Sequence, residues 1–369
     1  MSTRHCWGPM GVAVGIGRCL VLIVPLIGML MSLDVHAATA KEKKAKRAGQ
    51  QPTAPSAEPV VPHIAYLFPA GGQCGSTVKV TVGGQGLTRP QSVWIDGQGI
   101  TAGIDKAVDD KKLKISVIIA AEALPGERDL RVVTAGGVSN RIRFIVGRIP
   151  EVIEAEPNSK MTQAQRLPRL PVVVNGQVLE ADADLYRFQA KADQQLVLRV
   201  QARALIPFIA DAVPGWIQPT LILRDAVGKE LAYADDFRFD PDPVLLFQVP
   251  RDGEYVLEIK DALYRGRDDF VYRLIIGELP FITAIYPLGA RRDGPCHIEL
   301  SGCNLANKSL NFRLPGDCPD RWPISLDVGK LLSNTVSLAV GELPEVNESE
   351  PNNTQDKACE LKVPVTVNG

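Results

Sequence analysis

Residues 149–158 read Ile-Pro-Glu-Val-Ile-Glu-Ala-Glu-Pro-Asn, and residues 343–352 repeat them as Leu-Pro-Glu-Val-Asn-Glu-Ser-Glu-Pro-Asn. A second repeat relates Ile64-Ala-Tyr-Leu-Phe-Pro69 to Ile282-Thr-Ala-Ile-Tyr-Pro287. Internal repeats of this kind indicate an array of modules rather than one domain. We call the segment that begins with the Ile64 stretch module A and the segment that begins with the Ile149 stretch module B. The repeats then predict the order module A, module B, a shorter module A and the opening of a second module B.

Both modules are predicted to consist of β-strands. Residues 77–82 and 113–118 are rich in β-branched side chains. In residues 195–200, Leu196, Leu198 and Val200 alternate with Gln195, Val197 and Arg199, as expected for the two faces of a strand. Glycine-rich and Asp-Gly turns separate such runs, and no long segment has the period of a helix. We therefore predict an all-β fold of tandem antiparallel β-sandwiches. Residues 161–169 are the exception, where a short helix or an irregular crossing is expected.

The N-terminus has the features of a targeting segment. Residues 19–33 are apolar, positive charge precedes them, and Ala37 and Ala40 end two small-x-small cleavage sites. We predict a signal peptide and a secreted, periplasmic or cell-surface location, with no membrane span after cleavage. An uncleaved membrane anchor is the alternative, although a spanning helix needs about 20 apolar residues. The following segment, basic and then rich in Ala, Gln, Pro and Ser, predicts a disordered linker.

Charge and cysteine content limit the classes of function. The chain has 41 basic and 42 acidic residues, a net charge of −1, which argues against a nucleic-acid partner. No Cys-x-x-Cys pair supports a zinc or thioredoxin-like site. In an oxidising compartment, two of Cys296, Cys303 and Cys318 could form a disulfide. The equally favoured alternative is that all three remain reduced thiols. The other cysteines beyond the signal segment are Cys74 and Cys359.

Four motifs of module B occur in a defined order: Glu154-Ala-Glu-Pro-Asn158, Asp182-Ala-Asp-Leu-Tyr-Arg-Phe188, Ala234-Asp-Asp236 and Asp252-Gly-Glu-Tyr255. Together they resemble the bacterial pre-peptidase C-terminal domain. That family is a jelly-roll-like β-sandwich attached to secreted peptidases and other exported proteins. The resemblance implies this fold for residues 150–278 and, in part, for residues 344–369.

Module A resembles an immunoglobulin-like IPT/TIG domain. The resemblance lies in Pro69-Ala-Gly-Gly72, the strand that follows, and Gly83-Gly-Gln-Gly-Leu87. The whole arrangement is similar to multi-domain secreted proteins of planctomycete-type bacteria. The predicted order is a signal peptide (1–40), a disordered linker (41–62), an Ig-like sandwich (63–148), a pre-peptidase C-terminal-like sandwich (149–279), a second, shorter Ig-like module (280–342) and the truncated start of a second pre-peptidase C-terminal-like module (343–369).

An acidic cluster is the best candidate site. Carboxylate, amide and hydroxyl oxygens gather at the start of module B, and Ca²⁺ is a hard cation that takes six to eight oxygens. The resemblance implies the same ion, because collagenase domains of that family bind calcium through such a segment. Ser159 and Ala181 depart from the family pattern, since acids stand there in the family. A solvated acidic linker without metal is the alternative. The predicted metal ligands are Glu154, Glu156, Asn158, Ser159, Asp182 and Asp184.

Two further features have a structural and a functional interpretation. Asp235-Asp236, Asp240 and Asp242 could form a second calcium loop, but Asp also favours turns, and turn chemistry is the preferred interpretation. Phe208 and Trp216 lie in an apolar loop that could grip a sugar or a peptide. Packing of that loop over one end of the sandwich is the commoner use.

No catalytic motif is present. Beyond the signal segment the only histidines are His63 and His297, and neither belongs to an H-E-x-x-H or G-x-S-x-G motif. We predict an exported, non-catalytic modular protein that binds extracellular or cell-surface protein or polysaccharide, with calcium stiffening a junction between modules. The alternative is the non-catalytic accessory part of a secreted subtilase-like peptidase or other hydrolase whose catalytic domain is not in this chain.

Overall fold

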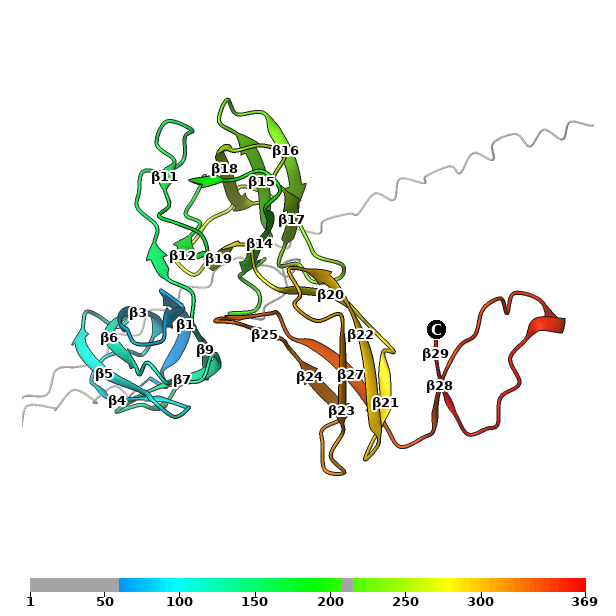
Figure 1. Ribbon diagram of the computed structural model, residues 1–369. Helices are drawn as coiled ribbons and strands as arrows, with labels where there is room; N and C mark the ends of the chain where they lie inside the picture. The colour runs from blue at the N-terminus through cyan, green and yellow to red at the C-terminus, as the bar shows by residue number, and fades with distance from the viewer. Residues whose placement is uncertain (1–59, 207–214) are drawn as a thin grey trace, which may run out of the picture. The chain divides into compact units, whose positions relative to one another are not determined.

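The computed structural model describes residues 60–206 and 215–369 and confirms the all-β fold class (Figure 1). Every regular element in these residues is a β-strand, apart from one turn of 3-10 helix at Gln355–Lys357. The predicted signal peptide lies outside the described residues, as does the predicted linker up to residue 59. Within the described residues, no helix is long and apolar enough to cross a membrane.

Residues 63–147 form two sheets, β1-β3-β6-β5 and β2-β9-β7-β4, with β8 added to β7. In β6, Leu113, Ile115 and Val117 are buried while Lys112 and Lys114 are exposed, as expected for a strand with one face on a core. The strands are β1 (His63–Phe68), β2 (Gly71–Gln73), β3 (Thr77–Gln85), β4 (Pro90–Ile95), β5 (Ile100–Ala107), β6 (Lys112–Ile119), β7 (Gly126–Thr134), β8 (Gly137–Val138) and β9 (Ile142–Gly147).

Residues 151–277 form two five-stranded sheets, β10-β12-β19-β14-β17 and β11-β13-β18-β15-β16. Tyr186 and Phe188 of one sheet, and Leu198 and Leu274 of the other, are fully buried in the core. The strands are β10 (Glu151–Ile153), β11 (Gln165–Arg166), β12 (Val172–Gln177), β13 (Asp184–Ala190), β14 (Gln195–Gln201), β15 (Pro219–Asp225), β16 (Glu230–Ala234), β17 (Val244–Gln248), β18 (Gly253–Asp261) and β19 (Val271–Gly277).

Residues 281–341 form a smaller pair of sheets, β20-β22-β23 and β21-β27-β24, with the hairpin β25-β26 beside them. Ile298, Leu314 and Leu338 are fully buried in a core of their own. The strands are β20 (Phe281–Tyr286), β21 (Gly289–Arg291), β22 (Pro295–Cys303), β23 (Ser309–Arg313), β24 (Arg321–Ile324), β25 (Asp327–Val328), β26 (Leu331–Leu332) and β27 (Val336–Gly341).

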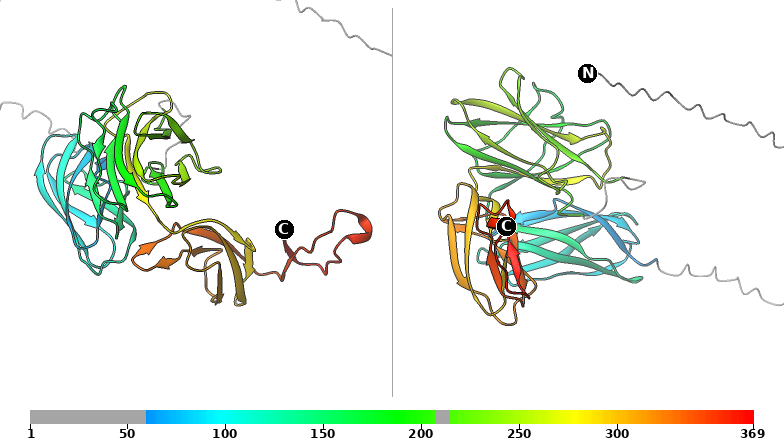
Figure 2. Two further views of the ribbon diagram at one scale, coloured as in Figure 1. Left: turned by 45° about the horizontal axis from the view of Figure 1, so that its top comes forward. Right: turned by 90° about the vertical axis from the view of Figure 1, so that its right-hand side faces the viewer.

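Residues 343–369 form one open loop rather than a sandwich (Figure 2). Strands β28 (Glu345–Asn347) and β29 (Thr366–Asn368) close its base by pairing in parallel. Their register, with Glu345 opposite Thr366, repeats the register of β10 and β12, where Glu151 lies opposite Val173. The sequence repeat therefore extends to backbone pairing.

Three details go beyond or correct the expectations from sequence. The sheets are not purely antiparallel, because β2, β10, β11 and β21 each add to a neighbouring strand in parallel. Residues 161–169 form turns and the two-residue strand β11, not a helix. The five cysteines of the described chain are free thiols, and Cys296, Cys303 and Cys318 are buried.

Candidate cation site

The first wall of the site is the coil that follows β10. The Glu154 amide N–H donates to the carbonyl of Asn175 at 3.0 Å, which continues the β10–β12 pairing by one residue. The side chain then turns inward, and its Oε1 accepts the Gln177 N–H at 2.9 Å. Glu156 follows two residues later, and its carboxylate accepts the Asn158 N–H at 2.9 Å. Both glutamates are thereby oriented by backbone donors.

The second wall is the start of β13, in the opposite sheet. Asp184 is fully buried, and its Oδ2 accepts a 2.7 Å hydrogen bond from the Tyr272 hydroxyl. The hydroxyls of Tyr272 and Tyr186 lie 2.5 Å apart. Because Tyr272 belongs to β19 and Tyr186 to β13, this chain of hydroxyls connects the two sheets at the depth of the site.

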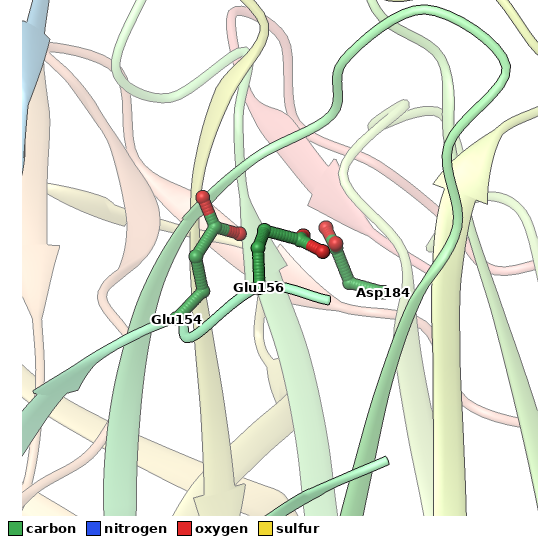
Figure 3. Close-up of side chains that lie close together, drawn as sticks. All are labelled: Glu154, Glu156 and Asp184. Carbon is green, nitrogen blue, oxygen red and sulfur yellow. The ribbon is translucent and has the colours of Figure 1, made fainter. Parts of the chain in front are cut away.

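Three carboxylates converge between these walls. Oxygen atoms of Glu154, Glu156 and Asp184 all lie within 4.8 Å of one another, and Figure 3 shows Glu156 between the other two. Burial, with the charges of Glu156 and Asp182, raises the pKa of Glu154 to about 8. Burial, followed by the charge of Glu154, raises the pKa of Asp184 well above its usual range. The cluster is therefore poorly compatible with three negative charges unless a cation neutralises them.

Several buried polar atoms at the site have no hydrogen-bond partner among the described residues. They are Glu154 Oε2, Asp184 Oδ1, and both Oδ1 and Nδ2 of the fully buried Asn158. Burying such atoms without a partner costs about 1–3 kcal/mol each. Oxygens of this kind fit a cation that is bound by carboxylate and amide groups.

Ser159 and Asp182, the other two predicted ligands, lie outside the three-carboxylate cluster. The Ser159 hydroxyl donates to Asp182 Oδ1 at 2.8 Å, and the same oxygen accepts the Ala183 N–H at 2.9 Å. Asp182 therefore acts on the site through its charge, which contributes to the raised pKa of Glu154 and Asp184.

Three residues that shape the site, Tyr186, Tyr272 and Gly176, are not among the ligands predicted from the sequence. A Cβ at Gly176 would lie 2.2 Å from Tyr272 Cζ and 2.6 Å from Glu154 Oε2, so only glycine leaves room for both side chains. The signal was present, because Val174-Asn175-Gly176 returns as Val367-Asn368-Gly369.

The second copy of the acidic motif reproduces the local bonding of the first. The Asn352 N–H donates to Glu350 at 2.8 Å, as the Asn158 N–H does to Glu156. Glu348 donates its N–H to the Asn368 carbonyl at 2.8 Å. In the described chain, however, no downstream aspartate joins this copy, so only the first copy forms a three-carboxylate cluster.

The other candidates from sequence have structural roles. Asp242 is buried and accepts the N–H groups of residues 202–204 at 2.8–3.1 Å, which is turn chemistry. Trp216 is buried with its ring edge-on to Phe270 at 5.4 Å. Phe208 lies outside the described residues. His297 is exposed on β22, with Nδ1 2.7 Å from Asn311 Oδ1.

No family model matches the chain. A probable subtilase-type serine protease of Deinococcus radiodurans is 31% identical over 166 residues, which cover 39% of this chain. The match spans about a fifth of that relative, 22% of its length.

Among solved structures, the pre-peptidase C-terminal domain of a collagenase from Bacillus anthracis is 17% identical. The likeness covers 33% of this chain and 99% of that domain, with a TM-score of 0.24. SGBP-B from a xyloglucan utilization locus of Bacteroides uniformis is 11% identical over 59% of this chain and 73% of that one, with a TM-score of 0.22. These likenesses are distant.

Proposed function

We propose that residues 149–279 form a calcium-stabilised β-sandwich in an exported, non-catalytic binding protein. The observation that carries the proposal is the convergence of Glu154, Glu156 and Asp184 beside the unpartnered amide of Asn158. Glu154 follows a strand of one sheet and Asp184 begins a strand of the other. A cation held by both would tie the two sheets together at the end where the chain enters the sandwich.

Calcium is the ion that fits this donor set best. The groups supply oxygen alone, which disfavours zinc and other ions that prefer nitrogen or sulfur. Ca²⁺ accepts six to eight oxygens in flexible geometry, so waters would complete the shell. Mg²⁺ demands near-ideal octahedral geometry and loses its water reluctantly. When bound, calcium would neutralise the carboxylates and supply the interaction that the unpartnered oxygens lack.

The wider role we propose is attachment to extracellular or cell-surface protein or polysaccharide. In this proposal the first 40 residues direct export, the Ig-like ranges 63–148 and 280–342 act as IPT/TIG-like spacers, and no nucleic acid is bound. The near-neutral net charge of −1 supports the last point.

The test is calcium titration of the chain by calorimetry, with thermal melts in EGTA and in Ca²⁺. We expect one bound calcium and a rise in Tm, because a ligand that binds only the folded state stabilises it. Asp184→Asn should abolish both effects while keeping an acceptor for Tyr272. No heat and no change in Tm at millimolar calcium would overturn the proposal.

Asp182→Asn is the matched control, because Asp182 carries the same charge a short distance from the cluster. It should weaken binding only slightly through its charge. If both substitutions abolished binding equally, the ion would be held by the whole acidic segment rather than by the three-carboxylate cluster. Mg²⁺ in place of Ca²⁺ should give a much smaller rise in Tm.

A second candidate function is the accessory region of a secreted peptidase. The partial match to the probable subtilase-type protease of Deinococcus radiodurans supports it. In this case the chain would bind a protein substrate or steady a catalytic domain. Pull-down on insoluble polysaccharides separates the two roles, since binding to a polysaccharide favours the first role and is not expected of a peptidase accessory region. Peptidase activity of the purified chain would contradict both.

A further inference from the structure

The outer face of the sheet β11-β13-β18-β15-β16 carries a connected row of polar side chains (Figure 1). At its centre is the buried Glu258 of β18. Its Oε2 accepts hydrogen bonds from Nε and Nη2 of Arg224 at 3.1 and 2.9 Å, and its Oε1 lies 2.8 Å from Nζ of Lys260. Lys260 Nζ also donates to the Tyr264 hydroxyl at 2.7 Å. Each side chain of this row is therefore held by the next.

A second tyrosine lies on the same face, at the edge strand β16. Tyr233 is opposite Ile222 of β15, which in turn is opposite Glu258. Cross-strand partners point to the same face of a sheet, and the two sequence neighbours of Glu258 are fully buried on the other face. Tyr233 therefore lies two strand spacings, about 10 Å, from Glu258. The Tyr233 and Tyr264 residues are 52% and 55% exposed.

The backbone at Tyr264 adopts a conformation that bulky residues rarely take. Its φ is 54°, in the left-handed region. The turn that imposes this φ is built on Asp261, which is fully buried. The Asp261 carboxylate accepts the N–H groups of Leu263 and Arg265 at 3.0 and 3.1 Å, and its carbonyl accepts the Tyr264 N–H at 2.9 Å. Strained residues that a rigid surrounding holds in place are concentrated at functional sites.

The charges of this face indicate the class of ligand. Two cations and three carboxylates nearly cancel here, namely Arg224, Lys260, Glu258, Glu230 and Asp235. A strongly charged polymer is therefore not matched. The centres of protein–protein interfaces are depleted of charged residues, whereas the centre of this face is an ion-pair network. A sugar ring has apolar C–H faces and hydroxyl edges, which match exposed aromatic rings and charged hydrogen-bonding groups.

We propose that Tyr233, Tyr264 and the row from Arg224 through Glu258 to Lys260 form a binding face for an uncharged polysaccharide. This proposal rests on the attachment role proposed above and assigns that role to one sheet. Sugar rings lie against the two tyrosines, and their hydroxyls exchange hydrogen bonds with Lys260 and Glu258 between them. Because the groups already hold one another in place, little side-chain entropy is lost on binding.

The test is affinity electrophoresis of the full chain in gels that contain hydroxyethylcellulose or galactomannan, with polygalacturonate as the charged comparison. We expect at least one of the uncharged polymers to retard the chain, and polygalacturonate to leave its mobility unchanged. Tyr233→Ala and Tyr264→Ala should each weaken binding about tenfold or more, because each variant loses the burial of one aromatic ring. The absence of retardation in both uncharged gels would overturn the proposal.

Two further variants test whether the tyrosines act on the ligand or on the fold. Phe239→Ala is the matched control, since Phe239 is an exposed aromatic residue of the same sandwich outside this face, and it should bind like the parent. Tyr264→Gly should lose binding and keep its Tm, because glycine adopts a positive φ without strain. A Tm that falls together with binding would make Tyr264 a structural residue and contradict its place in the face.

The assay also separates this proposal from the functions proposed above. Retardation that persists in both tyrosine variants would place the polysaccharide elsewhere on the chain, which contradicts this face but keeps the attachment role. We expect retardation in EGTA as well as in calcium, at a temperature where the chain is folded in both. Failure of the cation site would therefore leave the result at this face unaffected.

Discussion

Glu154 and Asp184 determine how pH acts on the central sandwich. Glu154 has a folded-state pKa of about 8, well above its ordinary value, because it is buried beside other carboxylates. At pH values between the ordinary pKa of a glutamate side chain and about 8, Glu154 holds a proton in the folded chain that it has released in the unfolded chain. Without metal, the free energy of unfolding should therefore fall as pH rises through this window, by up to about 1.4 kcal/mol per pH unit for one proton.

Calcium should reverse this dependence, because coordinated carboxylates are ionised and protons compete with the ion. Stability in calcium is then expected to be lost on acidification instead. Urea unfolding at a series of pH values, with EGTA or with calcium, gives both slopes. Glu154→Gln should flatten the slope measured in EGTA, and an unchanged slope would show that another group carries it.

Gly176 tests whether the shape of the site matters as much as its charge. In Gly176→Ala the new methyl would collide with Tyr272 and Glu154, so Tyr272 would have to move away from Asp184. We expect a loss of about 1–3 kcal/mol in stability, as for other overpacked interiors, together with weaker calcium binding. Thermal melts and calorimetry measure the two effects.

Gly253→Ala is the matched control in the same sandwich, since an added Cβ there meets nothing within 4 Å. Its stability should be unchanged or slightly higher, because alanine restricts the unfolded chain. An equal loss in both variants would mean that the methyl at residue 176 does not act through the site.

At the scale of elements, a Ser-Asn pair fixes β1 in residues 63–147 and β20 in residues 281–341. Asn140 accepts the Ile64 N–H at 2.7 Å and donates to the Ile64 carbonyl at 2.9 Å. Asn334 does the same to Ile282 at 2.7 and 2.9 Å. The preceding serines also match, since the Ser139 hydroxyl accepts the Val132 N–H and the Ser333 hydroxyl accepts the Leu326 N–H.

Removing either asparagine should release one edge strand. Asn140→Ala and Asn334→Ala each lose two hydrogen bonds and should lower the free energy of unfolding by about 1–2 kcal/mol. Hydrogen exchange at Ile64 or Ile282 would show which strand is released. The control Asn311→Ala removes an exposed asparagine and is expected to change stability by less than about 0.5 kcal/mol. Unchanged exchange at both isoleucines would disprove the role of the pair.

At the scale of the whole molecule, most buried apolar residues of 282–340 form a core separate from that of residues 64–276, and a smaller cluster of Val197, Val244, Leu279, Phe281 and Cys303 lies between them. Separate cores are expected to unfold in separate transitions. Differential scanning calorimetry should therefore resolve two transitions, with calcium raising only the one that contains Asp184. Asn334→Ala should lower only the other. A single transition that moves with both changes would show that the cores are coupled.

Much of the fold could be predicted from the sequence. Alternation in β6 and the turn at residues 251–254 identify strands through local chemistry alone. The repeats identify the order of the elements, because a repeated segment meets the same neighbours again. The sequence also grouped Glu154 and Glu156, which are close along the chain, and the family resemblance added Asp184 to them.

Tertiary structure alone decided which groups meet across the sheets. Tyr272 reaches Asp184 from 88 residues away, and Arg273 reaches Glu151 from 122 residues away. Such contacts depend on strand order and register, which local patterns do not encode. The same is true of Asp182, which has the same side chain as Asp184 two residues away, but bonds to Ser159 instead. The sequence by itself determined a β-sheet protein with an acidic motif, and the pairing of β12 with β19 and of β13 with β18 decided which of its acids lie together.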